Sequence, residues 1–181
     1  MGNIIENQIC SDVENLFKET NIEWKKGLQV EYERLVDSGM AHNGHTYKIL
    51  MKRGEELLNI LVDNITEIIN KYEKYKRKIS QKSLISKIDR WILSINNMID
   101  NFSNDVELKI QDKILMDNES NKTYISCLKD NYTNKLNRIY SNVVNIRSID
   151  RVKIITIINL VVTFFGSIAS IWSLVMQING A

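Results

Sequence analysis

Seven small or polar residues near the C-terminal end of the sequence recur at alternating spacings of three and four. Six of them lie within an uncharged stretch of 23 residues, 154–176, and the seventh follows it directly. Every bulky residue of that stretch lies at another position. Helices in lipid associate through small residues and interhelical hydrogen bonds, so we predict that this polar stripe is an association or pore-lining face. The stripe consists of Thr156, Asn159, Thr163, Gly166, Ser170, Ser173 and Gln177.

Three arrangements of a membrane helix agree with the polar stripe. In a monomeric anchor, the Ser and Thr hydroxyls would bond back to their own helix. In a dimer or trimer the stripe would lie in a dry seam, and in a larger ring it would face a central lumen. Such a lumen would discriminate weakly between ions, because no charge lines it. We favour self-association, because a plain anchor does not explain why bulky residues avoid all seven positions.

A second candidate site is a basic and aromatic segment, residues 71–78. Such a segment can bind anionic lipid headgroups, nucleic acid or a nucleotide signal. The simpler interpretation, which we favour, is a solvated helix end whose cations complement the helix dipole. We therefore do not expect nucleic acid as a partner. The cations of the segment are Lys71, Lys74, Lys76, Arg77 and Lys78.

Motifs for metal binding and catalysis find little support in the sequence. His42 and His45 have a spacing that could serve a metal, but neither cysteine is near them in sequence to complete a site. The sequence contains no Gly-rich phosphate loop, nucleophile elbow or His-Glu-x-x-His motif. We therefore predict a protein that is not an enzyme, needs no cofactor or metal, and has exposed loop histidines.

Composition and charge predict the compartment. The 181 residues carry a formal net charge of +2, which implies no general affinity for polyanions. Two cysteines do not make a disulfide framework, so a reducing compartment is expected. Basic residues, including Arg151 and Lys153, precede the uncharged stretch and none follows it. The positive-inside rule therefore predicts a single-pass, tail-anchored protein with a cytoplasmic N-terminal domain and an external C-terminus.

The rest of the chain has the periodicity of helices. It contains no proline, and apolar residues recur at helical spacing in several blocks. The capping-box spacing of residues 20–23 predicts one helix start, and residues 104–107 predict another. Gly39 can take a left-handed helix cap, and residues 80–83 are a candidate break. Residues 120–178 can form one continuous helix, because no glycine or proline lies between 146 and 154.

We therefore predict an all-α fold, in which an elongated cytoplasmic bundle of about four to six helices, partly coiled-coil, occupies residues 1–150. One transmembrane helix would occupy residues 151–178, followed by a short external tail, 179–181. The strongest apolar stripes of the expected bundle are Gly54, Leu57, Leu61, Ile65, Ile68, Tyr72, Tyr75 and Ile79 in one block, and Leu84, Ile88, Trp91, Ile95, Met98 and Phe102 in another.

Two functions agree with this architecture. The first is an oligomeric membrane effector whose C-terminal helices associate along the polar stripe and form a pore or perturb the membrane. Membrane-disrupting antiviral defence effectors are similar in architecture alone. The second is a tail-anchored scaffold or tether that recruits a cytoplasmic protein partner. The expected partners are thus the lipid bilayer, further copies of the chain, and a cytoplasmic protein or signal.

Overall fold

The computed structural model of this chain describes residues 2–41, 45–74, 80–110 and 118–179, and from residue 164 on it describes the backbone alone. The described residues form four helices and no strand: α1 (Gly2–Asp37), α2 (Thr46–Lys74), α3 (Gln81–Ile110) and α4 (Asn118–Asn179). The predicted all-helical bundle is therefore confirmed. The chain divides into two compact units, Met1–Tyr140 (unit 1) and Ser141–Ala181 (unit 2). The boundary between these units lies within α4, and so does the domain boundary predicted at residue 150.

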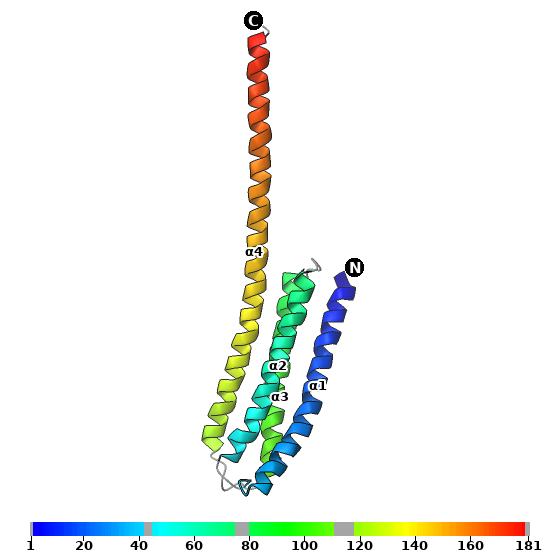
Figure 1. The fold of residues 1–181 in the computed structure, drawn as a ribbon, viewed down its shortest axis with the longest axis vertical. Coiled ribbons are helices and arrows are strands. Elements are labelled where there is room, and N and C mark those ends of the chain that lie inside the picture. Colours follow the sequence, from blue (N-terminus) through cyan, green and yellow to red (C-terminus); the bar gives the residue numbers. More distant parts are fainter. Residues whose placement is uncertain (1, 42–44, 75–79, 111–117, 180–181) are drawn as a thin grey trace. The chain divides into compact units, whose positions relative to one another are not determined.

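The core of unit 1 lies between α1, α2 and α3, which pack against one another side by side (Figure 1). Each helix contributes an apolar stripe of three- and four-residue spacing, the pattern of a helix with one buried face. The stripe predicted in α3 is confirmed, since each of its named residues is at most 5% exposed. In α2, Gly54, Leu57, Leu61 and Ile65 are buried, Ile68 and Tyr72 are half-buried, and Tyr75 and Ile79 lie outside the described residues. Helix α1 contributes Ile9, Val13, Trp24, Leu28 and Leu35.

Helix α1 is a single helix, so the helix start predicted at Thr20 is wrong. The Thr20 hydroxyl donates a hydrogen bond to the backbone carbonyl of Leu16 at 2.8 Å, which is the bond of a threonine inside a helix. Val13 before it and Trp24 after it are both buried in the same core. Continuous packing on both sides of residue 20 keeps the helix intact despite the local capping signal.

The end of α1 has the left-handed glycine predicted from the sequence. Gly39 has a φ of 71°, a conformation that costs little only for glycine. The Met40 amide donates to the Leu35 carbonyl at 2.8 Å and the Gly39 amide to the Val36 carbonyl at 2.9 Å. These bonds satisfy carbonyls that the helix end would otherwise leave unpaired.

Helix α3 begins where the sequence predicts a break and continues past a predicted second start. The Ser80 hydroxyl accepts a hydrogen bond from the Ser83 amide at 3.1 Å, so Ser80 is the N-cap of α3. The helix start predicted at residues 104–107 is wrong, because α3 runs through them to Ile110. Val106 is fully buried, and Asp105 accepts a hydrogen bond from Trp24 Nε1 at 2.9 Å. These contacts hold residues 104–107 in the helix.

Gly54 allows two aromatic rings to meet inside the bundle. The rings of Trp24 in α1 and Phe102 in α3 are stacked, with centroids 4.1 Å apart. A Cβ atom added to Gly54 of α2 would lie 2.7 Å from Cδ2 of Phe102 and 3.1 Å from Cζ3 of Trp24. The missing side chain at position 54 therefore provides the space that the stacked rings occupy.

The first part of α4, up to Tyr140, belongs to unit 1 but stands further from its neighbours. Among the described residues, no Cα atom of α4 lies within 8 Å of a Cα atom of α1, α2 or α3. Leu128, Tyr132 and Leu136 are nevertheless buried. Long side chains therefore fill the space between α4 and the other helices. Helix α4 is unbroken to Asn179, as the sequence allows.

Unit 2 consists of the remainder of α4. Every side chain from 151 to 163 is exposed, and most of them are Ile, Leu or Val. In the part of the chain that the structure describes, no helix meets the length and hydropathy that a membrane span requires.

Candidate functional site

The described part of the polar stripe comprises Thr156, Asn159 and Thr163, and all three side chains are exposed. The hydroxyl of Thr156 donates to the backbone carbonyl of Val152 at 2.9 Å, and that of Thr163 to the carbonyl of Asn159 at 2.8 Å. These bonds are the ones expected of threonines that bond back to their own helix. The carboxamide of Asn159 therefore remains the strongest described group of the stripe for bonding to another helix.

The other four stripe residues lie on the backbone of α4, and their side chains lie outside the described residues. They are Gly166, Ser170, Ser173 and Gln177. They belong to the same helix as Thr156, because α4 is continuous to Asn179. Their role in association stays a prediction.

The apolar side chains on both sides of the stripe are exposed. Ile154, Ile155, Ile157 and Ile158 are each more than half exposed, and Leu160 is 69% exposed. Successive residues of an α-helix are about 100° apart, so these five positions spread over roughly 220° of the circumference, and Thr156, Asn159 and Thr163 lie in the remaining arc. A soluble helix normally exposes a polar face, and an apolar patch of this kind marks a surface that another phase or molecule covers.

In unit 1, polar side chains join α4 to α2. Tyr132 Oη donates to the backbone carbonyl of Glu55 at 2.9 Å, and Tyr124 Oη donates to the carboxylate of the same residue at 3.2 Å. Lys135 Nζ donates to Asn59 Oδ1 at 2.6 Å and lies 4.9 Å from the centroid of the Tyr132 ring. Buried hydroxyls need such partners, so these bonds fix where α4 lies along α2.

The tyrosines of this contact should make unit 1 sensitive to alkali. Burial, and next the charge of Glu55, raise the pKa of Tyr124 to about 12 and that of Tyr132 well above its usual range. Above about pH 10 the unfolded chain loses these protons while the folded chain keeps them. The stabilisation that these two protonated tyrosines give is therefore fully present below pH 10, and it is expected to be lost as the pH rises toward 12. Thermal melting across this range should show the fall, and Tyr124→Phe should reduce it.

The variant Glu55→Gln tests the contribution of the Glu55 charge to the raised pKa of Tyr124. It removes the negative charge beside Tyr124, so the pKa of Tyr124 should fall toward its ordinary value. Ultraviolet absorbance of tyrosinate during an alkaline titration measures this directly. An unchanged titration in Glu55→Gln would contradict the contact between Tyr124 and Glu55.

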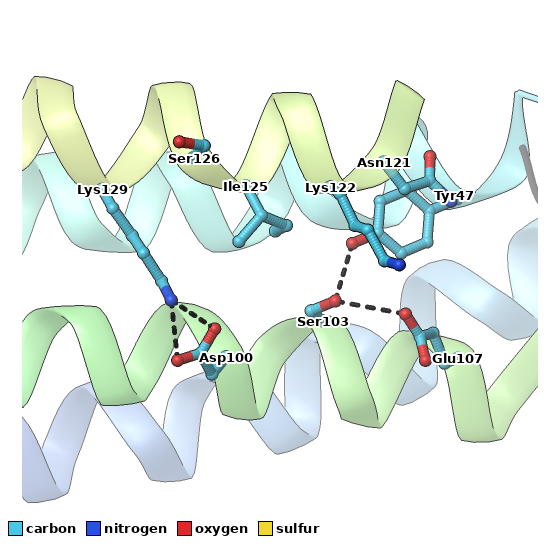
Figure 2. A pocket seen from close by; sticks show the side chains of 9 residues that line it. All are labelled: Tyr47, Asp100, Ser103, Glu107, Asn121, Lys122, Ile125, Ser126 and Lys129. Carbon is cyan, nitrogen blue, oxygen red and sulfur yellow. Dashed lines mark hydrogen bonds and ion pairs between the residues drawn. The ribbon is translucent and has the colours of Figure 1, made fainter. Parts of the chain in front are cut away.

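A cavity of about 310 Å³ lies between the start of α2, α3 and α4, within unit 1 (Figure 2). Lys129 Nζ of α4 lies 2.6 Å from Asp100 Oδ1 of α3. The hydroxyls of Tyr47 and Ser103 share a hydrogen bond of 2.8 Å, and the Ser103 hydroxyl donates to Glu107 at 3.4 Å. The lining residues are Tyr47, Asp100, Ser103, Glu107, Asn121, Lys122, Ile125, Ser126 and Lys129.

The polar contacts in this cavity lie where α4 stands apart from α3, and they bridge the space between the helices. The charge of Asp100 is compensated by Lys129 across the gap, and the hydroxyls of Tyr47 and Ser103 bond to each other. Figure 2 shows Lys129 reaching from α4 to α3, the same role that Lys135 has toward α2. The cavity thus forms part of the contact that holds α4 to unit 1.

The predicted basic segment is described only in part. Lys71 is exposed in the last turn of α2, and Lys74 is the final residue of that helix. Lys76, Arg77 and Lys78 lie outside the described residues. The structure therefore places the first of these cations on the surface.

The predicted histidine pair is divided in the same way. His45 is exposed directly before α2, in agreement with an exposed loop residue, and His42 lies outside the described residues. Within the described ranges, no group of three His, Cys, Asp or Glu side chains is placed to hold a metal ion.

Sequence reasoning missed the polar contacts of α4. Tyr124, Leu128, Tyr132 and Leu136 recur at helical spacing in the sequence, so the two tyrosines resemble ordinary core residues. The signal that could have revealed them is that a buried tyrosine hydroxyl requires a partner. No family model, no curated protein and no solved structure matches this chain.

Proposed function

We propose that this protein is a membrane effector that acts as an oligomer. In this proposal, unit 1 is cytoplasmic, the uncharged stretch 154–176 enters the bilayer, and copies of the chain associate along the polar stripe. The associated helices form a pore or perturb the membrane. No catalytic step is part of the proposal.

The exposed apolar surface of α4 is the observation that carries the proposal. Residues 154–162 expose Ile, Leu and Val side chains over all of the helix surface except the polar stripe, with 44–69% of each apolar residue accessible. Transfer of one such side chain out of water gains about 1.5–3 kcal/mol. The seven apolar residues of 154–162 together favour a lipid or protein environment by up to about 10–20 kcal/mol, which is comparable to a typical domain's net stability of about 5–15 kcal/mol.

The stripe supports association in preference to a single anchor. The Thr156 and Thr163 hydroxyls bond within their own helix and so place no demand on a neighbour. Asn159 instead carries a carboxamide five positions into the uncharged stretch. In lipid, this group gains from a partner on another helix, where such hydrogen bonds contribute about 0.6–2 kcal/mol.

A second candidate function is a tail-anchored scaffold, and a groove between α1 and α2 favours it. The groove has a volume of about 910 Å³ and is lined by alternating charges, including Glu23, Lys26 and Arg53. Val30 in its wall is 66% exposed. A polar rim around an exposed apolar side chain is the composition of a transient protein interface.

The oligomeric state of the full chain in mild detergent tests the proposed function. We expect a defined oligomer that dissociates more readily in Asn159→Leu, by about 3- to 30-fold in its dissociation constant for each lost interhelical hydrogen bond. The matched control is Ile158→Leu, an apolar change next to the stripe, which should leave the oligomer unchanged. Analytical ultracentrifugation measures both. A strictly monomeric protein would contradict association, and the tail-anchored scaffold would then be the remaining candidate function.

A further inference from the structure

The exposed side of α3 carries a set of uncharged residues along about four turns of the helix. Five of them recur at spacings of four, four, three and four, so they lie within an arc of about 80° around the helix. The leucines at the two ends of the set are 61% and 73% exposed, and the three residues between them are asparagines. We call these five residues the amide face: Leu93, Asn97, Asn101, Asn104 and Leu108.

The charged residues of the same stretch turn away from the amide face, toward the neighbouring helices. Asp100 pairs with Lys129 of α4, with Oδ1 and Nζ 2.6 Å apart. Asp105 accepts the indole hydrogen bond of Trp24 in α1, and Glu107 lines the cavity beside α4. These three carboxylates are the only charged residues from position 93 to position 108. The amide face is therefore an uncharged surface between α1 and α4.

This composition differs from that of the other exposed helix sides in unit 1. Helix α1 exposes Lys25 and Lys26, and helix α2 exposes Glu56 and Glu67. Charged residues are depleted in the cores of protein interfaces, because burial removes water that only a well-placed partner replaces. An uncharged helix side with an exposed leucine at each end has the composition of such a contact surface.

The asparagines of the amide face also indicate which partner fits. Their side chains form no hydrogen bond with another described residue. Each carboxamide has both donors and an acceptor, so two identical carboxamides can satisfy each other. A strongly charged partner, such as a nucleic acid or an anionic membrane, would find no opposite charge here. A second copy of the same face is therefore the chemically matched partner.

The amide face has the same order of residues in both directions about a midpoint between residues 100 and 101. Leu93 and Leu108 are equally far from this midpoint, and so are Asn97 and Asn104. In an antiparallel pair with a two-fold axis at the midpoint, Leu93 of each copy would meet Leu108 of the other. Asn97 would meet Asn104 in the same way, and Asn101 would lie near the axis opposite its own counterpart.

Arg90 decides the direction of the pair. It is exposed on the same side of α3, nearly one turn before Leu93. In a parallel pair, the two Arg90 guanidinium groups would lie opposite each other and repel. In an antiparallel pair, they lie at opposite ends of the contact, each beyond Leu108 of the other copy. The charges therefore favour the antiparallel pair.

We infer that the amide face binds the amide face of a second copy in an antiparallel pair. Five side chains from each copy make a small interface, so we expect weak and transient pairing. Because Asp100 contacts Lys129, the midpoint lies beside residue 129, and residue 140 lies roughly 16 Å further along α4.

The antiparallel pair is a different contact from association along the polar stripe. The residue-140 ends of the two copies lie roughly 30 Å apart along the helix axes, whereas packed helices are about 8–10 Å apart. The inference goes beyond the proposed function and does not depend on membrane insertion.

Disulfide formation in the full chain, in mild detergent, tests both the contact and its direction. Asn97→Cys and Asn104→Cys are made separately, in chains that also carry Cys10→Ser and Cys127→Ser. Mild oxidation should give a covalent dimer in a mixture of the two variants. Either variant alone should give none, because identical positions lie about 10 Å apart along the axis, beyond the reach of a disulfide.

The opposite results overturn the inference. No dimer in the mixture would exclude the contact, and a dimer with Asn97→Cys alone would show a parallel pair. The control is the native Cys127 in Cys10→Ser, which is exposed on α4 and should give no dimer.

Negative charge at both ends of the amide face should break the pair. L93E/L108E changes two exposed residues, so unit 1 should remain folded. It removes the leucine contacts and sets carboxylates against each other, and we expect the dissociation constant to rise at least about 100-fold. The matched control is V30E/I60E, which adds the same charge at residues of α1 and α2 that are 66% and 54% exposed. Equal effects of the two double variants would overturn the inference.

Sedimentation of the full chain distinguishes this pair from the oligomer of the proposed function. A dimer that persists in Asn159→Leu but is weakened in L93E/L108E is the antiparallel pair. An oligomer that is weakened only in Asn159→Leu supports association along the polar stripe and overturns the pair. Weakening in both variants supports both contacts, and an oligomer that neither variant affects overturns both.

Discussion

Removal of residues 154–181 is expected to abolish membrane depolarisation by this protein. Cells that produce the full chain should lose membrane potential and stop growing, because the uncharged stretch carries every membrane contact in the proposed pore. The truncated chain keeps all of unit 1 and should have no such effect. A potential-sensitive dye in cells with matched expression levels measures the difference, which should be complete.

The double substitution of Asn159 and Thr163 by Leu separates a pore from an anchor. It keeps the stretch apolar and uncharged, so membrane insertion should remain. It removes the strongest described association group and one hydroxyl of the stripe. We expect vesicle association to persist while conductance in planar bilayers changes or disappears. The matched control Val161→Leu, on the apolar side, should conduct like the unmodified chain.

The outcome also decides between the two functions. An uncharged lumen should pass cations and anions with similar ease, so its reversal potential in a salt gradient should lie near zero. If overproduction of the full chain is harmless and no conductance appears, the scaffold remains. The groove beside Val30 would then be the surface to test for a protein partner.

The second large effect is expected at Gly54. In Gly54→Ala the new Cβ atom would lie 2.7 Å from the Phe102 ring and 3.1 Å from Trp24, both within the buried core. Overpacking of this kind costs about 1–3 kcal/mol, and the better helix propensity of alanine offsets up to about 1 kcal/mol. We expect net destabilisation on the order of 1–2 kcal/mol. Thermal melting of the full chain in mild detergent measures it.

Gly27→Ala is the matched control for that experiment. Gly27 also lies in a helix interior, but the neighbour of its new Cβ would be the side chain of Arg53, 3.2 Å away at Nε. That side chain is flexible and exposed, so it can move aside. Gly27→Ala should therefore be neutral or stabilise the chain by up to about 1 kcal/mol. Equal melting of the two variants would contradict the close approach at Gly54.

The elements that sequence predicts well are those that local physics decides. The stripe from Leu84 to Phe102 repeats at helical spacing without interruption, and burial of one face follows directly. The end of α1 is predictable because few residues other than glycine tolerate the φ of 71° found at Gly39.

The wrong predictions come from local signals that packing overrides. Residues 20–23 and 104–107 both have the composition of a helix start. Each set nevertheless lies inside a helix, and residues before and after it pack into the same core. Thr20 bonds to the Leu16 carbonyl instead, and Asp105 receives the Trp24 indole of another helix. A capping motif states what a helix end requires, not that an end exists.

The contacts of α4 lie beyond sequence reasoning for a different reason. The partner that Tyr124 and Tyr132 share, Glu55, lies 69 and 77 residues away along the chain. Which polar group meets each hydroxyl depends on the distance between α4 and α2, and no local pattern encodes that distance. The polar stripe, in contrast, was visible in the sequence, and its role in association stays a prediction.

The contact between α4 and α2 has a consequence for movement. Tyr124 and Tyr132 are two turns apart, yet both bond to Glu55, while Lys135 bonds to Asn59 one turn further along α2. A displacement of α4 along its axis by a fraction of a turn would strain all three bonds together. Helical contacts can recur only after a full turn of about 5.4 Å. Any axial movement of α4 within unit 1 is thus a step between discrete registers, not a gradual slide.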